Sequence, residues 1–485
     1  MLFLIIYSRR RYFYFQVAIK ASCTENSLHA MSANKKCLFI FRRDLRLTDN
    51  TGLIEAGKLY KTVIPCFILD PRQVQAHPFR SLPALRFMLD SLKDLERQLA
   101  GRGGKLSLFH GRPETIINDL ISTHKIDAVV INTDYTPFSR KRDGQLRRLC
   151  RSLGVAFHAW HDLLLTTPEQ ALKKDGTPYT VFTPFFNKAF GFNVSKPQNT
   201  STVKFARRSL GEPSKNIYGN LQDKAVPSLT VPPGRSGAMS ILKRLGEYKN
   251  YGEERDLPEL DATTHLSAHL KFGTCSVREA YYAIRKNLGT SHDLIRQLYW
   301  RDFYTHIAWH FPHVFGHAFK RQYDELPWRN DRKAFNAWCR GRTGFPIVDA
   351  GMRQLNNSGF MHNRVRMITA SFLIKDLHID WRWGERYFAT RLIDYDPCVN
   401  NGNWQWAAST GCDPQPWFRI FNPWRQQKKF DGNCAYIHRW VPELDNVPAS
   451  RIHKVNEGGK IPGYPAPIVD HAARVKITKK LYKKI

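Results

Sequence analysis

Short apolar runs alternate with helix-like segments over the first third of the chain, and this alternation limits the fold more than any other feature. The stretch between them at 82–99 repeats apolar residues at helical spacing and ends before Gly101. Alternation of this kind is typical of a doubly wound parallel α/β sheet. The runs that have the length and composition of buried strands are 37–41, 62–69 and 128–131.

Two of these expected strands end in polar residues. Ligands of doubly wound sheets bind at the carboxyl ends of the strands. The polar segments at those ends are Arg42-Arg43-Asp44 and Asn132-Thr133-Asp134-Tyr135.

The pattern changes twice further along the chain. From residue 161, Pro, Ser, Thr, Asn and Gly become frequent and periodicity fades, which indicates a long connector. Beyond it the spacing becomes helical, clearest at 295–311, 363–380 and 382–392. The predicted organisation is an α/β domain at 34–160, a connector at 161–232, an all-α domain at 233–475 and a basic tail at 476–485.

Residues 1–33 are expected to lie outside the fold. The apolar stretch 1–7 precedes Arg9-Arg10-Arg11, which reverses the order of a secretory signal. The segment is either an organelle transit peptide or an upstream start with Met31 as the initiator.

The charge balance predicts a polyanionic partner. The 485 residues contain 74 Lys+Arg against 42 Asp+Glu, a formal net charge of +32. Counterion release then favours nucleic acid, although a basic surface also serves solubility. The nine cysteines are scattered without a CxxC pair, so we expect a reducing intracellular compartment and no metal site. No segment is long and apolar enough to span a bilayer.

The run from Asn400 to Cys412 predicts a slot for a flat ligand. Two indoles, Trp404 and Trp406, follow a series of amides, and small residues come after them. Small residues let the backbone approach a ligand closely, and tryptophans offer rigid faces. A helix that opens within Thr263 to Ser267 would place hydroxyl caps and free N–H groups in its first turn, and such N–H groups suit phosphate. Each feature alone is also consistent with ordinary packing or capping.

Together these residues carry a resemblance that spans 36–444. The chain resembles the photolyase/cryptochrome flavoprotein family and, within it, is most similar to class I cyclobutane pyrimidine dimer photolyases. The fold implied is a doubly wound α/β domain followed by an all-α domain that binds FAD. The matching segments are 41–50, 343–350, 361–367, 376–386 and 400–411.

The resemblance implies FAD, reduced in the active form, folded into a U within the helical domain. Asn400 would lie beside flavin N5, where a neutral amide accepts a hydrogen bond from a protonated nitrogen. Around the ring and ribityl chain the implied residues are Gln297, Arg301, Asn363, Asp394 and Asp396. Around the diphosphate they are Tyr251, Thr263, Thr264, His265, Leu266 and Ser267.

The implied reaction is light-dependent repair of DNA by a carbon–carbon lyase. A pyrimidine dimer is flipped out of the strand, and excited reduced FAD donates one electron that opens the cyclobutane ring. The residues implied at the reacting centre are Gln297, Trp300, Asn363, Asn400 and Trp406. Those implied in contact with DNA are Arg255, Trp300, Arg364, Arg366, Trp406 and Arg419. Trp328, Trp381 and Trp404 match the family's electron-transfer chain, an assignment that rests on the resemblance alone.

Two positions depart from the class I pattern. Gln297 stands where those enzymes usually have glutamate, and glutamine occurs there in (6-4) photolyases. The two histidines of (6-4) chemistry fall at Asn363 and Met367, neither of which titrates near neutral pH, so the cyclobutane dimer remains the expected substrate. Ser139 replaces the glutamate of folate-antenna members, which leaves folate, a deazaflavin or no antenna open.

Two other functions remain open. A cryptochrome would signal through a partner, but only about forty residues follow Leu444, and the basic charge favours repair. A basic nucleic-acid binder without catalysis would be colourless. We expect a monomer that acts on dimer-containing DNA without an obligate protein partner.

Overall fold

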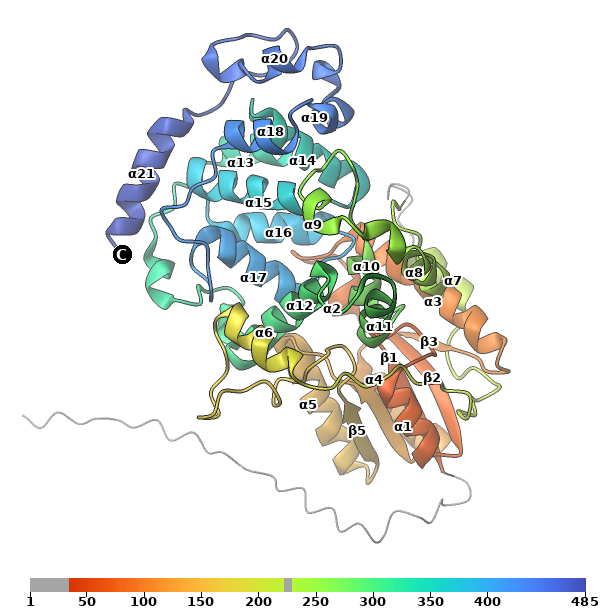
Figure 1. Cartoon of the computed structure of the whole chain (residues 1–485). Coiled ribbons are helices and arrows are strands. Elements are labelled where there is room, and N and C mark those ends of the chain that lie inside the picture. The colour runs from red at the N-terminus through yellow and green to blue at the C-terminus, as the bar shows by residue number, and fades with distance from the viewer. Residues whose placement is uncertain (1–34, 222–228) are drawn as a thin grey trace, which may run out of the picture.

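A computed structural model describes residues 35–221 and 229–485 of the chain, so the predicted extension at 1–33 lies outside the described residues. Figure 1 shows a sheet flanked by helices at one end of the molecule and a larger group of helices at the other. The predicted combination of an α/β domain with an all-α domain is confirmed.

The sheet has five parallel strands in the order β3-β2-β1-β4-β5. The three predicted strands are present, and two further strands went unpredicted because β3 has only four residues and β5 is an edge strand with exposed side chains. Their bounds are β1 Lys36–Phe41, β2 Thr62–Leu69, β3 Ser107–His110, β4 Ala128–Asn132 and β5 Ala156–Trp160.

Both faces of the sheet are covered by helices. Alternate residues of β1 point to opposite faces, so Phe39 packs with Leu53 and Leu89 of α1 and α3, and Leu38 packs with Ile117 and Leu146 of α4 and α5. Helices on both faces make the fold doubly wound. The helices of this part are α1 Thr51–Leu59, α2 Pro71–Val74, α3 Leu82–Ala100, α4 Pro113–His124 and α5 Pro137–Ser152.

The predicted connector is more ordered than its composition indicates. The N–H of Val63 donates to Lys204, and that of Glu212 donates to Leu108, so the connector runs along β2 and β3. It also forms two helices, α6 Phe182–Phe190 and α7 Ser214–Leu221. Helix α6 packs against the helical half, with Phe182 and Phe185 in the same core as Phe303.

The helical half is built around a second large core in which Trp338 and Trp381 are fully buried. The predicted helix over 363–380 is interrupted: α15 ends at Ser371 and a π-helical segment, η4, spans Phe372–Asp376. The main helices are α8 Gly234–Lys243, α9 Tyr251–Glu254, α10 Leu266–Phe272, α11 Val277–Leu288, α12 Asp293–His310, α13 Arg332–Cys339, α14 Pro346–Ser358, α15 Asn363–Ser371, α16 Trp381–Arg391, α17 Pro397–Ala408, α18 Pro423–Phe430, α19 Ala435–Trp440, α20 Ala449–Ile452 and α21 His471–Lys483. Short 3-10 turns join them: η1 Leu245–Tyr248, η2 Pro312–Val314, η3 Arg321–Glu325, η5 Pro442–Leu444 and η6 Val455–Glu457.

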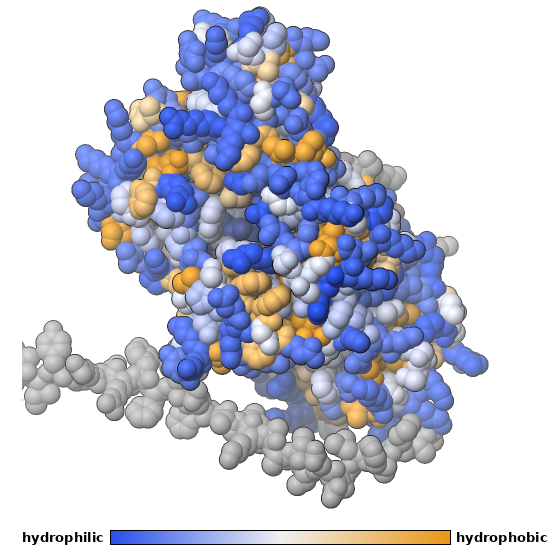
Figure 2. All heavy atoms as spheres, viewed as in Figure 1, coloured by the Kyte–Doolittle hydropathy of each residue, from blue (hydrophilic) through white to orange (hydrophobic). Residues whose placement is uncertain are grey.

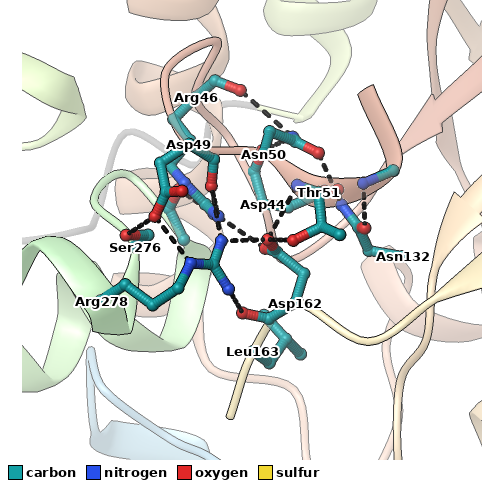
Figure 3. A network of polar contacts seen from close by, with 12 residues as sticks. Asp44, Arg46, Asp49, Asn50, Thr51, Asn132, Asp162, Leu163, Ser276 and Arg278 are labelled. Atoms are coloured by element: carbon teal, nitrogen blue, oxygen red, sulfur yellow. Dashed lines mark hydrogen bonds and ion pairs between the residues drawn. The ribbon is translucent and has the colours of Figure 1, made fainter. Parts of the chain in front are cut away.

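A buried network of charges joins the two halves (Figure 3). Asp162, after β5, accepts from Arg46 at 2.6 Å and from Arg278 of α11 at 2.8 Å. Arg278 also pairs with Asp49 at 2.9 Å, and Ser276 donates to the same carboxylate at 2.5 Å. Burial opposes ionisation of Asp162, but the two guanidinium groups outweigh it and hold its pKa well below the usual range.

The residues expected as a basic tail form most of α21. Tyr482 is buried, and its hydroxyl donates to the carbonyl of Ala408 at 2.6 Å. Thr478 donates to the carbonyl of Lys375 at 2.5 Å. The positive charge of 476–485 therefore belongs to a docked helix, whose apolar and hydroxyl positions the sequence prediction overlooked. No helix among residues 35–221 and 229–485 combines the length and hydropathy needed to cross a bilayer.

Candidate cofactor and nucleic-acid site

Helices α12 and α17 carry four of the five residues that the sequence placed at the reacting centre, all but Asn363 of α15, and they pack against each other at Gly402. A Cβ at this position would overlap the ring of Tyr304, so a larger residue would push the two helices apart. Trp300 and Trp406 lie on these helices and both remain partly exposed. Because the two helices touch at Gly402, these two accessible indoles lie on neighbouring helices.

Asn400 sits in the first turn of α17, and its position is set by α16. Its side-chain amide donates to the backbone carbonyl of Glu385 at 3.2 Å, which leaves the amide oxygen available as an acceptor. The Glu385 carboxyl accepts from Asn401 at 2.9 Å. Burial raises the pKa of Glu385 to about 7.

Glu385→Gln should change how stability depends on pH. The pKa of Glu385 is raised on folding, so its stabilising contribution is complete below the ordinary glutamate pKa and is lost as pH rises through about 7. Glutamine keeps the acceptor for Asn401 and cannot ionise. We expect the free energy of unfolding in urea to fall between pH 5 and pH 8.5 in the parent protein. This fall should exceed the fall in the variant by about 1–3 kcal/mol. Equal decreases would contradict a buried carboxyl with a raised pKa.

Aspartates at the start of α17 are tied to arginines. Asp396 caps α17 through the N–H of Cys398 and pairs with Arg43, which comes from the end of β1. Asp394 pairs with Arg366 of α15 at 3.0 Å. Burial raises the pKa of Asp396, but Arg43 and Lys271 lower it further, to about 2 in all. Asp396 is therefore negative at neutral pH, and both carboxylates are fixed in place by their arginine partners.

The expected phosphate loop differs from its prediction in one respect. Helix α10 begins at Leu266, after His265 in the left-handed region with φ +53°, and the Thr264 hydroxyl accepts from the N–H of Leu266 at 3.4 Å. Thr263 and Thr264 thus precede the helix, and Ser267 is exposed. The Thr263 hydroxyl is buried and has no hydrogen-bond partner among the described residues.

A cavity of about 510 Å³ lies beside this loop. His362, which is almost fully buried, also lines it, and its Nδ1 accepts from the N–H of Arg364 at 3.3 Å. Burial lowers the pKa of His362 to about 4, so the ring is neutral and Nε2 carries the hydrogen. Nε2 has no partner among the described residues. Buried donors without partners are unusual in native proteins and suit a ligand with acceptor oxygens.

Two other expected cofactor residues have protein partners. Arg301 donates to the carbonyls of Leu163 at 2.5 Å and Leu270 at 3.2 Å, so it ties the connector and α10 to α12. Tyr251 begins α9 and is half-buried beside Arg255. Asn363 is exposed at the start of α15, and Gln297 is partly exposed on α12.

The three tryptophans expected in electron transfer all belong to the second large core. Trp381 and Trp404 are buried, and Trp328 packs against the same cluster while remaining partly exposed. Gly384 of α16 makes room for Trp404, because a Cβ there would overlap its ring. This order of exposure is what a path from the surface to the interior requires.

The arginines expected to contact DNA differ in how tightly carboxylates of the protein hold them. Arg364 pairs with Asp256 at 2.5 Å, and Arg366 is held by Asp394. Arg255 lies 3.8 Å from Asp293, a weak exposed pair. Arg419 is exposed in the loop after α17. Arg419 and Arg255 are therefore the best placed of the four to reach a phosphate.

These residues fit FAD. The unpartnered Thr263 and His362 donors suit its diphosphate, and the Asn400 oxygen and the fixed carboxylates suit a ring with polar edges. Figure 2 shows a hollow in the middle of the helical half, over the helices that Figure 1 labels α15, α16 and α17.

Comparison with known proteins supports the same assignment. A family profile described as "DNA photolyase" matches residues 37–200, and one described as "FAD binding domain of DNA photolyase" matches residues 294–484. A deoxyribodipyrimidine photo-lyase of Alkalihalophilus pseudofirmus is 39% identical over 91% of this chain and 97% of its own. The chain belongs to the DNA photolyase family. The predicted resemblance is therefore confirmed.

Other members of the family align over similar lengths. The deoxyribodipyrimidine photo-lyase of Escherichia coli is 36% identical over 90% of this chain and 96% of its own. A crystal structure of an archaeal photolyase from Sulfolobus tokodaii with two FAD molecules has a TM-score of 0.86 and 44% identity, and covers 93% of this chain and 100% of its own. A Synechocystis cryptochrome has a TM-score of 0.83 and 28% identity over 93% of this chain and 100% of its own.

Sequence reasoning missed several residues of this region. Glu385 and Phe182 hold Asn400 and Trp300, yet neither carries a motif of its own. Arg43, which holds Asp396, lies in the predicted segment Arg42-Arg43-Asp44, but this contact was not predicted. Glu385 lies inside the matched segment 376–386, which was the one signal that pointed near it.

Proposed function

We propose that this protein is a light-dependent DNA repair enzyme that splits cyclobutane pyrimidine dimers with reduced FAD. Membership of the family and the deoxyribodipyrimidine photo-lyase names of relatives over nearly the whole chain support this function. The observation that carries it is the pair of accessible indoles, Trp300 and Trp406, on helices closed together at Gly402 beside Asn400.

FAD, when bound, reduced and excited by light, supplies the electron that opens the cyclobutane ring. The protein's own part is binding and orientation. Trp300 and Trp406 offer apolar walls to a pyrimidine dimer flipped out of the strand, where lost stacking in the damaged DNA lowers the cost of flipping. The Asn400 amide is held by the Glu385 carbonyl, so its oxygen stays directed away from α16 to accept a hydrogen bond.

Gln297 supports a thymine dimer as the substrate. It lies one helical turn before Arg301 on α12 and remains partly exposed. Its amide both donates and accepts, as the edge of a thymine requires. Asn363 and Met367 supply no acid of pKa near 7 at the positions where (6-4) chemistry uses histidines.

The decisive experiment compares two lesions in light and in darkness. The reduced protein is incubated with oligonucleotides that carry one cyclobutane thymine dimer or one (6-4) product. We expect the cyclobutane dimer alone to disappear, and only under blue light. Loss of the (6-4) product instead would reassign the substrate, and loss of neither would exclude repair.

Phosphate contacts are expected from Arg255 and Arg419, with Arg364 and Arg366 placing α15 through their carboxylate partners. Arg419→Ala should reduce the slope of log K against log salt by about one unit, because one phosphate contact is lost. Arg97→Ala removes the same charge from α3 of the α/β domain and is the control. Equal slopes in parent protein and Arg419→Ala would remove Arg419 from the interface.

A blue-light photoreceptor is the second candidate, favoured by the similarity to the Synechocystis cryptochrome. The same two-lesion experiment separates the candidates, because a photoreceptor without repair activity leaves both lesions intact while its flavin still responds to light.

We further propose a second chromophore at the carboxyl edge of the sheet, between β1 and β4, where the strand order reverses. Phe138 is exposed there, with guanidinium groups of Arg72 and Arg142 at 5.2 and 5.9 Å from its ring. One nitrogen of the buried Arg142 has no partner among the described residues. Ser139 donates to Asp134 at 2.9 Å.

The Sulfolobus tokodaii photolyase holds two FAD molecules, which makes a flavin the first candidate for this second site. Chromophores released from the purified protein identify it: two flavins per chain support a flavin antenna. One flavin together with a folate or a deazaflavin would show that the antenna is that second molecule and not a flavin.

A further inference from the structure

We propose that Phe182, in the segment between the two domains, is a positioning residue that fixes the plane of Trp300 for recognition of the dimer. The inference rests on the proposed repair function. The Phe182 and Trp300 rings are stacked, with centroids 3.6 Å apart and an interplanar angle of 6°. This is the closest and most nearly parallel ring pair among the described residues.

Phe182 is itself rigidly held. It is 1% exposed and is the first residue of α6. Its N–H donates to the carboxylate of Asp413 at 2.9 Å, which ties α6 to the loop after α17. The guanidinium of Arg296, one helical turn before Trp300, lies 4.9 Å from the Phe182 ring. The ring thus has little room to move away from the indole.

The stack closes one face of Trp300. Phe303 and Tyr304 flank the same indole at 5.7 and 5.6 Å, which further restricts its rotation. Trp300 nevertheless stays partly exposed, so a remaining part of its surface faces outward. A side chain held in one orientation before binding loses less conformational entropy when a base stacks on it.

Helix α6 offers a matched control for this role. Phe185 is as buried as Phe182 and lies on the same helix. The rings that it contacts among the described residues are those of Phe303 and His306, at 5.4 and 4.9 Å. Phe182→Leu and Phe185→Leu therefore remove the same atoms from the same core, and only the first removes the support of Trp300.

Binding of a single-stranded oligonucleotide with one thymine dimer tests the proposal. We expect Phe182→Leu to raise Kd about fivefold to tenfold, a part of the effect of losing a base–aromatic stack. Repair per absorbed photon at saturating DNA should stay unchanged, because the flavin site is not altered. Phe185→Leu should bind with the parent Kd, and Phe182→Tyr, which keeps an aromatic face, should bind within twofold of it.

A double-mutant cycle separates positioning from general destabilisation. In a Trp300→Ala background, Phe182→Leu should change Kd by less than twofold, because there is no indole left to orient. The proposal would be overturned if Phe182→Leu lowered the affinity equally in both backgrounds. It would also be overturned if Phe182→Leu bound with the Kd of the parent protein. If Phe182→Leu does not retain FAD, Phe182→Met provides the same comparison. Failure of the parent protein to repair the dimer would refute the proposed function instead.

Discussion

Replacing Asp162 by alanine is expected to lower the free energy of unfolding by about 3–5 kcal/mol. Arg46 is 1% exposed, and it would lose its carboxylate partner at 2.6 Å while remaining buried. Arg278 would lose a partner at 2.8 Å, and Thr51 would lose an acceptor for both its N–H and its hydroxyl. Figure 3 shows that these groups converge on the one carboxylate.

Urea unfolding followed by circular dichroism measures this effect. Glu55→Ala is the control, because Glu55 pairs with the exposed Lys58 and such pairs contribute roughly 0–1 kcal/mol. Asp162→Ala should also release FAD more readily, since the network joins β1 and β5 to α11 next to the helical core. If Asp162→Ala lowers the free energy of unfolding by no more than Glu55→Ala does, the network does not hold the two halves together.

Trp300→Ala is expected to weaken binding of dimer-containing DNA by about 1–3 kcal/mol, the size of one lost base–aromatic stack. Trp300 is partly exposed and already oriented by three neighbouring rings, so its surface is available to the flipped lesion without rearrangement. Affinity for undamaged DNA depends mainly on phosphates and should change little.

Fluorescence anisotropy with paired damaged and undamaged oligonucleotides measures both affinities. Trp309→Ala removes a partly exposed indole from the same helix, where it packs on Tyr135 and Arg140, and is the control. It should leave the preference for damaged DNA intact. If Trp300→Ala also keeps that preference, Trp300 does not contact the lesion.

The sequence predicted those parts of the fold that local pattern determines. The predicted bounds of the strand at 62–69 and of the helix at 82–99 agree with the structure to within one residue, because apolar periodicity and flanking turns coincide there. The edge strand β5 was not predicted, since none of its side chains is fully buried and His158 interrupts its apolar residues. Helix α6 was not predicted, because it lies in a segment rich in Pro and Asn and only tertiary packing stabilises it there.

The candidate site shows the same division. Motif matches predicted Asn400 and Trp300, but no sequence pattern predicts that the Glu385 carbonyl holds the first or that Phe182 stacks on the second. Such supports come from segments more than 100 residues away in the case of Phe182, so only the folded chain brings them together. The helix expected to open at Thr263 starts later for the same reason: the backbone turns left-handed at His265, and α10 begins at Leu266.

The central claim is that the helical half holds a redox flavin behind an entrance walled by Trp300 and Trp406. A crystal structure of the FAD-loaded protein with a dimer-containing duplex tests it most directly. The account predicts the dimer flipped out of the duplex, in contact with both indoles and next to the flavin, with Phe182 still stacked behind Trp300. A dimer that remains stacked in the duplex, or that lies away from α12 and α17, would contradict it.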